Sequence, residues 1–149
     1  IFFCKGVLET VKKLGWTPDI VHCNDWMTSL IPLYLKTTYK NDPLFQDTKT
    51  VFTIYNNSFA HQFDEDLLDK VKMMDISDSM LENLKSADFA GFIKTGAQYA
   101  DAVIKAEEEV SESLNQLLEE IEKQKTVNTI EKDDNFLDSY YNLYNELVG

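Results

Sequence analysis

The sequence predicts an α/β protein built on a three-layer, Rossmann-like parallel sheet. Two short apolar runs, at residues 19–23 and 50–54, are rich in β-branched side chains and have the continuous hydrophobicity of strands covered on both faces. A helical pattern separates them, further helical patterns follow, and a third short run lies at 101–104. The order strand–helix–strand–helices–strand is typical of parallel βαβ units, so we expect the strands to pair in parallel.

Helical periodicity defines the segments around these strands. Apolar residues recur at helical spacing over about 3–14, and Gly15 follows as the expected C-terminal cap. Pro32 fits the first turn of the next helix, where its missing N–H costs little. Further helical segments are expected from about residue 64, at 80–85 and over 89–100.

Residues 106–149 differ from residues 1–105 in charge and in periodicity. They hold 12 acidic and 3 basic residues, against 14 and 11 in the preceding part. Two amphipathic helices are expected, over about 107–124 and 134–148, with a polar loop at 126–132. Their apolar stripes are Val110, Leu114, Leu117, Leu118 and Ile121, and then Leu137, Tyr140, Tyr141, Tyr144, Leu147 and Val148. We therefore expect a Rossmann-like domain over 1–105 and an acidic helical hairpin over 106–149 that packs on it or on a second copy.

Composition narrows the class of protein. A chain of 149 residues that is 44% hydrophobic is enough for one ordinary globular domain. The net charge is −12 and all 14 basic residues are Lys, which disfavours nucleic-acid binding and excludes a phosphate site built on Arg within this chain. No apolar run approaches the roughly 20 residues that span a bilayer, and the opening residues lack the features of a signal peptide.

The first residue and the cysteines bear on the origin of the chain. It begins with Ile1 rather than Met, as expected for a fragment or a processed piece. Without a secretory signal, Cys4 and Cys23 are expected to be reduced thiols. We therefore expect a cytoplasmic protein that has neither nucleic-acid nor membrane partners.

Polar residues follow the first two strands, at the edge where parallel α/β sheets bind ligands. The candidate ligand rim consists of His22, Asn24, Asp25, Trp26, Tyr55 and Asn56. In one interpretation Asp25 accepts hydrogen bonds from a polyol and Trp26 stacks on a sugar. In the other, which the residues alone favour, Asp25 caps a helix, Trp26 belongs to the core and Tyr55 packs at a strand end.

Other kinds of site lack their motifs. Neither His22 nor His61 pairs with Cys or carboxylate residues at zinc-ligand spacing, so no metal is expected. The five glycines are scattered, so there is no glycine-rich phosphate loop. No nucleophile elbow is present either. The rim is therefore the main candidate site.

Three stretches of the sequence resemble motifs of one family. Residues 18–32 read PDIVHCNDWMTSLIP, residues 51–56 read VFTIYN, and residues 92–101 read FIKTGAQYAD. Bacterial glycogen synthases and plant starch synthases have, in the same order, a strand ending in His-Ala-His-Asp-Trp-His, a Phe-Thr-(Ile/Val)-His-Asn strand and a Phe-Leu-Lys-Ala-Gly-x-x-Tyr-Ala-Asp block. The chain is similar to that family over about residues 1–104.

The resemblance implies a two-domain, retaining glycosyltransferase that moves glucose from ADP-glucose to the non-reducing end of an α-1,4-glucan. This chain would be the later part of the N-terminal, acceptor-side domain. ADP-glucose would be its donor substrate, with no cofactor or metal, and an α-glucan or maltooligosaccharide its partner. Asp25 and Asn56 match the family motifs, and His22, Asn24 and Trp26 lie beside them as further substrate-binding candidates.

The sequence also departs from the family pattern. Tyr55 stands where the family has an essential histidine, and its phenol is longer than an imidazole and a poor general base at pH 7. Asn24 and Met27 replace two further histidines, residues 105–109 replace a Val-Ser-Pro-x-Tyr segment, and the donor-binding domain has no counterpart here. Two hypotheses remain: a glucosyltransferase piece that needs residues outside this chain, and a non-catalytic module. The module would bind glucan, a protein partner or a second copy through its C-terminal helices.

Overall fold

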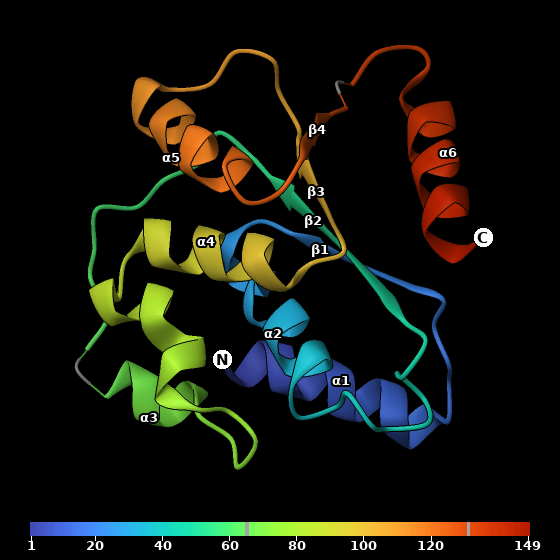
Figure 1. Ribbon diagram of the computed structural model, residues 1–149, viewed down its shortest axis with the longest axis vertical. Helices are drawn as coiled ribbons and strands as arrows, with labels where there is room; N and C mark the ends of the chain where they lie inside the picture. The colour runs from blue at the N-terminus through green and yellow to red at the C-terminus, as the bar shows by residue number, and fades with distance from the viewer. Residues whose placement is uncertain (65, 131) are drawn as a thin grey trace.

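The computed structural model describes residues 1–64, 66–130 and 132–149. Its centre is an all-parallel sheet of four strands in the order β1-β2-β3-β4 (Figure 1). The strands are β1 (Ile20–Asn24), β2 (Lys49–Ile54), β3 (Ala102–Lys105) and β4 (Val127–Thr129). The predicted α/β class and the parallel pairing of the first three strands are confirmed.

Helices connect the strands, as βαβ units require. They are α1 (Phe2–Leu14), η1 (Trp26–Thr28), α2 (Leu30–Lys36), α3 (Leu67–Val71), η2 (Asp78–Ser86), α4 (Phe89–Tyr99), α5 (Glu112–Glu122) and α6 (Phe136–Val148), where η marks a 3-10 helix. Gly15 ends α1 in the left-handed conformation, with φ of 66°, as predicted. Asp88 caps α4 by accepting a hydrogen bond from the Gly91 N–H at 2.8 Å.

The main core lies between the sheet and helices α1, α2, α4 and α5. Phe52 of β2 is fully buried there, and α4 approaches it closely at Gly96. A Cβ atom added to Gly96 would lie 2.7 Å from the Phe52 ring, closer than real side-chain contacts allow. The glycine of the third sequence motif is therefore needed so that α4 can pack on the sheet.

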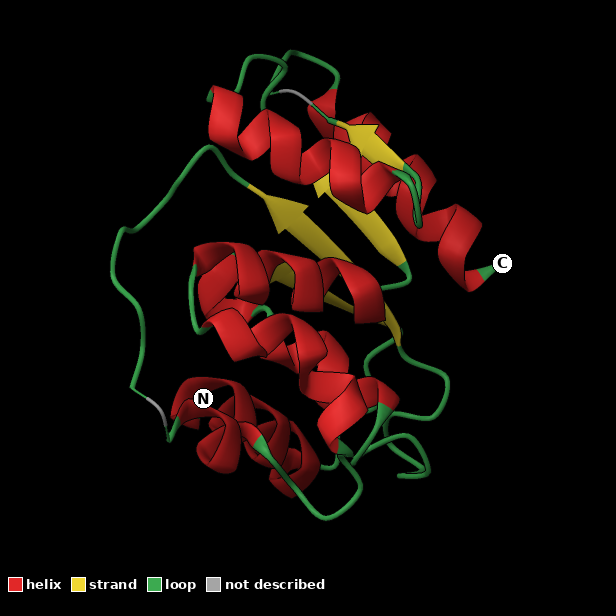
Figure 2. Cartoon of the chain, turned by 60° about the vertical axis from the view of Figure 1, so that its left-hand side comes forward, coloured by secondary structure: helices red, strands yellow, loops and turns green. Residues whose placement is uncertain are grey.

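The expected helical hairpin over 106–149 is wrong. Strand β4 lies between α5 and α6 and pairs in parallel with β3, so the segment expected as a polar loop at 126–132 extends the sheet. The helices α5 and α6 lie on opposite sides of the strands (Figures 1 and 2). The strand escaped prediction because it has only three residues at the sheet edge, and two of these, Asn128 and Thr129, are exposed and polar.

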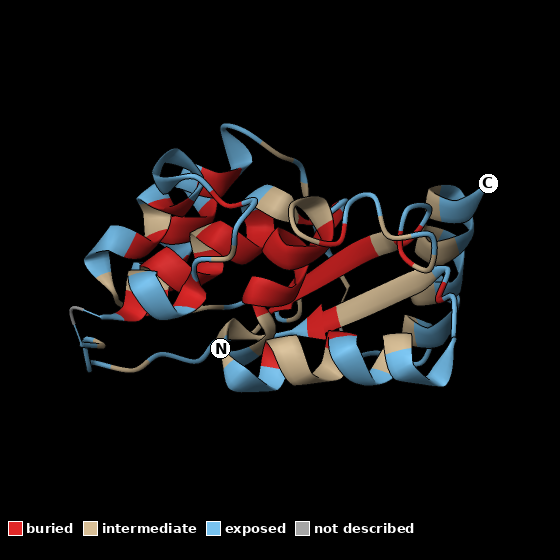
Figure 3. Cartoon of the chain, turned by 90° about the horizontal axis from the view of Figure 1, so that it is seen from below, coloured by how far each residue is buried: buried red, intermediate tan, exposed pale blue. Residues whose placement is uncertain are grey.

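The two tail helices also differ in burial (Figure 3). Four members of the predicted stripe, Leu114, Leu117, Leu118 and Ile121, are buried in the main core, whereas the fifth, Val110, precedes α5 and is partly buried against that core. Helix α6 has no fully buried residue and packs on a second, smaller core of Val51, Ala102 and Ile104. Its packed face is Tyr140, Leu143, Tyr144 and Leu147, whereas the predicted members Leu137, Tyr141 and Val148 are exposed.

Candidate functional site

The carboxyl ends of all four strands meet at one edge of the sheet. Just beyond them, the Ala106 N–H donates to the Ile54 carbonyl at 3.0 Å and the Ile130 N–H donates to the Lys105 carbonyl at 3.1 Å. The segments that leave the strands therefore start side by side. In parallel α/β sheets this edge is where ligands bind.

A cavity of about 400 Å³ lies at this edge, between the strand ends and α6. We call it the strand-end cavity; it is lined by His22, Asn24, Tyr55, Ala106, Glu107, Ile130, Lys132, Phe136, Tyr140 and Tyr144. Its volume falls in the range of about 300–1,000 Å³ that is typical of small-molecule sites. Four of its lining residues are aromatic, and amide, hydroxyl and charged groups stand among them.

His22 is held by protein partners on both ring nitrogens. Its Nδ1 atom lies 2.6 Å from the Tyr144 hydroxyl, and its Nε2 atom lies 2.6 Å from the Thr53 hydroxyl. Burial lowers the pKa of His22, so the ring is neutral at pH 7, with one nitrogen donating and the other accepting. His22 thus positions Tyr144 and has no ring nitrogen left for a ligand.

Tyr55 and Asn24 form the polar wall of the cavity. The Tyr55 hydroxyl donates a hydrogen bond to Asn24 Oδ1 at 3.0 Å. Burial raises the pKa of Tyr55, and the nearby Tyr140, Asp25 and Glu107 act in the same direction. The phenol therefore stays neutral and serves as a hydrogen-bonding group rather than as a base.

Asp25 adopts an unusual backbone conformation directly after β1. Its φ of 64° and ψ of 173° lie in a region occupied almost only by glycine, at a cost of about 1–3 kcal/mol. Its carboxylate accepts hydrogen bonds from the Trp26 N–H at 2.8 Å and from Asn57 Nδ2 at 2.7 Å. Asp25 thus caps η1, and such strain is found most often at functional sites.

Trp26 and Asn56, two of the residues expected in the rim, are not among the residues that line the cavity. Trp26 is partly buried and packs against the main core, with its ring centroid 4.7 Å from that of Phe59 and 6.1 Å from that of Phe92. Asn56 accepts a hydrogen bond from the Ser111 N–H at 3.0 Å, which ties the end of β2 to the start of α5. The expected rim residues do not all lie at the cavity, because the chain turns to the other side of the sheet after each strand.

Of the six expected rim residues, the structure brings His22, Asn24 and Tyr55 together at the cavity. Sequence reasoning missed the contribution of α6, which supplies Phe136, Tyr140 and Tyr144. The tyrosines were recognised as a helical stripe, but periodicity does not say which face of the sheet a helix covers. The cavity therefore became visible only when the topology was known.

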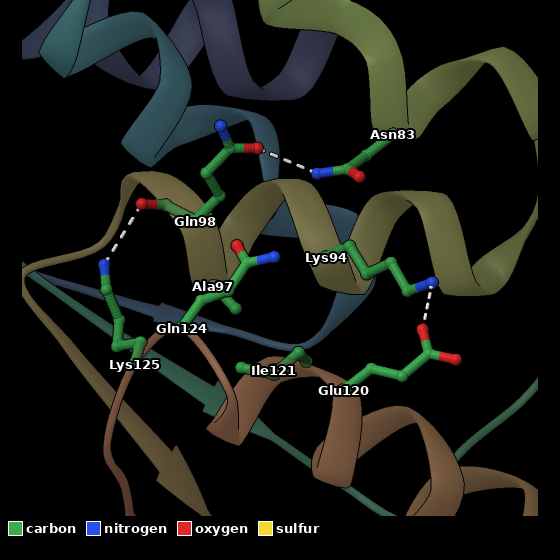
Figure 4. A pocket seen from close by; sticks show the side chains of 8 residues that line it. All are labelled: Asn83, Lys94, Ala97, Gln98, Glu120, Ile121, Gln124 and Lys125. Carbon is green, nitrogen blue, oxygen red and sulfur yellow. Dashed lines mark hydrogen bonds and ion pairs between the residues drawn. The ribbon is translucent and has the colours of Figure 1, made fainter.

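A second cavity, of about 220 Å³, lies between α4, α5 and η2 (Figure 4). Its polar groups bind one another: Lys94 Nζ lies 2.5 Å from Glu120 Oε2, and Asn83 Nδ2 donates to Gln98 Oε1 at 2.8 Å. Lys125 donates to the Gln98 carbonyl at 3.1 Å, at the C-terminal end of α4. These contacts join α5 to α4, and we interpret this cavity as structural.

Residues 1–64, 66–130 and 132–149 lack two further kinds of feature. That part of the chain has no group of three or more His, Cys, Asp and Glu side chains placed to hold a metal ion. It also has no helix that is both long enough and apolar enough to cross a membrane.

Comparison with known proteins identifies the family. The protein-family model for the starch synthase catalytic domain matches residues 1–127 of this chain. The chain belongs to the starch synthase catalytic domain family. Among its relatives, the glycogen synthase of Desulforudis audaxviator is 43% identical over 104 residues, which is 68% of this chain and 20% of the relative. The glycogen synthases of Clostridium botulinum strain Alaska E43 and Thermotoga maritima are 40% and 42% identical over 103 residues, 22% and 21% of their lengths.

These matches define what is shared and what is not. The chain spans about a fifth of the length of these relatives. The family match ends at the first residue of β4, so α6 lies beyond it. The strand-end cavity thus combines strand ends from the family match with a helix from outside it.

The last residue of the third motif, Asp101, has a structural role. Its carboxylate accepts hydrogen bonds from the Thr50 N–H at 2.7 Å, the Thr50 hydroxyl at 3.0 Å and Lys36 Nζ at 2.8 Å. Burial acts to raise the pKa of Asp101, but the bonds from Lys36 and Thr50 outweigh it and lower the pKa. Asp101 therefore joins α2 and β2 to the start of β3 as a carboxylate.

Proposed function

We propose that this chain supplies the acceptor-side part of a site that transfers glucose from ADP-glucose to an α-1,4-glucan. The observation that carries the proposal is the strand-end cavity, whose residues His22, Asn24 and Tyr55 lie in the stretches that resemble the family's motifs. Membership of the starch synthase catalytic domain family and relatives named glycogen synthase support the choice of reaction.

The chemistry of the cavity fits an acceptor better than a donor. Tyr55 and Asn24 offer uncharged hydrogen-bonding groups of the kind that recognise sugar hydroxyls, beside the neutral His22 that holds Tyr144 in place. A diphosphate calls for several cationic donors, and Lys132 is the one cationic side chain among the described lining residues. We therefore propose that the diphosphate of ADP-glucose is bound by residues outside this chain.

The proposal is tested by glucan binding and by turnover. An isotope-labelled chain is titrated with maltoheptaose, and we expect NMR shifts at Asn24 and Tyr55 at millimolar sugar. The absence of any shift would rule out the acceptor role. In a second assay the chain is incubated with ADP-glucose and a glucan primer, and ADP release is measured. We expect no turnover, and none restored by Tyr55→His, whereas rates above about 1 per second would contradict the division between acceptor and donor parts.

A non-catalytic binding module is the second candidate function. It is favoured by Tyr55 at the family's histidine position and by the outward face of α6, where Leu137, Tyr141 and Val148 are 68%, 66% and 46% exposed. Such a face fits a protein partner or a second copy of this chain. Sedimentation velocity of the chain and of Leu137→Asp distinguishes the two, because a dimer that uses this face dissociates in the variant.

A further inference from the structure

The aromatic side chains of α6 form a continuous wall on one side of the strand-end cavity. Phe136, Tyr140 and Tyr144 are spaced four residues apart and so lie along one face of the helix. The ring centroids of Phe136 and Tyr140 are 6.4 Å apart, and those of Tyr140 and Tyr144 are 6.0 Å apart. All three residues are half-buried, so part of each ring faces the cavity.

This wall is held in place before any ligand arrives. The Tyr144 hydroxyl is hydrogen-bonded to His22, which is in turn hydrogen-bonded to Thr53 of β2. The His22 ring also lies against Tyr140, with centroids 5.4 Å apart. Leu143 and Leu147 fix the helix on the second core. A preorganised wall loses little side-chain freedom on binding, and this favours affinity.

The opposite wall carries neutral polar groups, Asn24 and the Tyr55 hydroxyl. The charged lining residues Glu107 and Lys132 have opposite signs, and the chain as a whole carries a net charge of −12. These features disfavour an anionic ligand. They suit a neutral molecule with flat apolar faces and many hydroxyl groups, which is the chemistry of a saccharide ring.

We propose that α6 supplies a stacking wall for a neutral saccharide, with a pyranose ring against Tyr140 and its hydroxyls bonded to Asn24 and Tyr55. The identification of that saccharide as an α-glucan rests on the proposed function. The site itself is assigned from α6, which lies beyond residues 1–127 that match the family model. The specificity of this chain for its sugar therefore depends on a segment outside the family match.

The test compares neighbouring tyrosines of the same helix. Tyr140 faces the cavity, whereas Tyr141 is 66% exposed and does not line it. Binding of maltoheptaose to the unmodified chain, Tyr140→Leu and Tyr141→Leu is measured by isothermal titration calorimetry. Leucine keeps the apolar bulk but removes the aromatic face. We expect Tyr140→Leu to weaken binding tenfold or more and Tyr141→Leu to change it less than twofold.

Further variants separate the failure of this inference from the failure of the proposed function. If Tyr140→Leu binds like the unmodified chain while Asn24→Ala is weakened, the sugar lies at the strand ends without α6, and only the wall is refuted. If the unmodified chain does not bind maltoheptaose at millimolar concentration, the acceptor role fails and the glucan assignment with it. Tighter binding of ADP-glucose that is lost in Tyr140→Leu would overturn the choice of a neutral ligand. Thermal melts check folding, and Phe136→Leu probes the same wall if Tyr140→Leu does not fold.

Discussion

Helices α5 and α6 both belong to the acidic tail and are both amphipathic, yet they contribute differently to the molecule. Helix α5 buries four aliphatic side chains in the main core, while α6 buries none completely and lays half-exposed tyrosines over the opposite face of the sheet. The strand-end cavity lies under α6. An apolar stripe thus predicts which face of a helix is covered but not how completely it is buried, and an incompletely buried face leaves room for a ligand.

Side-chain chemistry explains the difference. Leucine and isoleucine have no polar atoms and are stabilised by complete burial, as in α5. A tyrosine hydroxyl needs a hydrogen-bond partner or water, so complete burial of the α6 stripe would carry a penalty. Tyr144 meets this need through His22. We conclude that α5 is held mainly by the hydrophobic effect, and α6 in part by a polar contact.

The largest effect on stability is expected when one leucine of each helix is replaced by aspartate. Leu117 of α5 is 8% exposed and Leu137 of α6 is 68% exposed. Leu117→Asp places a charge in the main core and leaves the apolar contacts unfilled, so we expect the free energy of unfolding to fall by about 4 kcal/mol or more. Leu137→Asp should change it by less than about 0.5 kcal/mol. Urea denaturation measures both, and similar losses would remove the distinction between the helices.

A second prediction concerns Asp101, whose carboxylate joins α2 and β2 to the start of β3. Asp101→Ala leaves the N–H and hydroxyl of the fully buried Thr50 without their acceptor, and we expect a loss of about 2–3 kcal/mol. The control is Asp138→Ala, which removes an exposed carboxylate from the first turn of α6, where a negative charge is stabilised by the helix dipole. There we expect about 0.3–1 kcal/mol. An equal loss in the two variants would show that Asp101 has no special anchoring role.

The amino-acid sequence was sufficient to predict most of the helices and strands and the sheet edge at which the site lies. It was not sufficient to predict which residues line the site. The first three strands and the long helices were predictable because apolar periodicity and caps such as Gly15 are local signals. Strand β4 was not, since a short edge strand is stabilised by pairing with β3, and that pairing is not local. The residues alone favoured a core position for Trp26, which packs against the main core, but Tyr140 and Tyr144 could not be placed at the cavity, because their positions depend on which face of the sheet α6 covers.

Glycine substitutions test the tight packing of the main core. In Gly96→Ala the new methyl group meets the Phe52 ring, and we expect overpacking to cost about 1–3 kcal/mol. An added Cβ at Gly6, within α1, has no heavy atom within 4 Å beyond its chain neighbours and the nearby backbone of α1, so Gly6→Ala should stabilise the chain by about 0.5–1 kcal/mol. Thermal denaturation of both variants checks the opposite signs. A stabilised Gly96→Ala would mean that α4 is packed no more tightly than α1.

The smallest expected effect is a pH dependence confined to α6. Burial lowers the pKa of His22 below the ordinary value of about 6.5, so the unfolded chain takes up a proton at a higher pH than the folded chain does. The contribution of His22 to stability is therefore fully present above about pH 6.5 and is lost as the pH falls through the folded-state pKa. A protonated ring donates from both nitrogens, so the Tyr144 and Thr53 hydroxyls must both accept. We expect this to loosen α6 before α5.

Hydrogen exchange measures that difference directly. After correction for intrinsic exchange rates, the amides of α6 should lose protection as the pH falls below about 6.5, the ordinary pKa of histidine, while those of α5 keep it. His22→Gln should abolish the pH dependence, whereas the matched control His61→Gln, at an exposed position, should retain it. A parallel loss of protection in α5 and α6 would argue against His22 as the local link. If α6 alone responds, its position over the cavity is coupled to the protonation of a strand residue, and saccharide binding should weaken over the same pH interval.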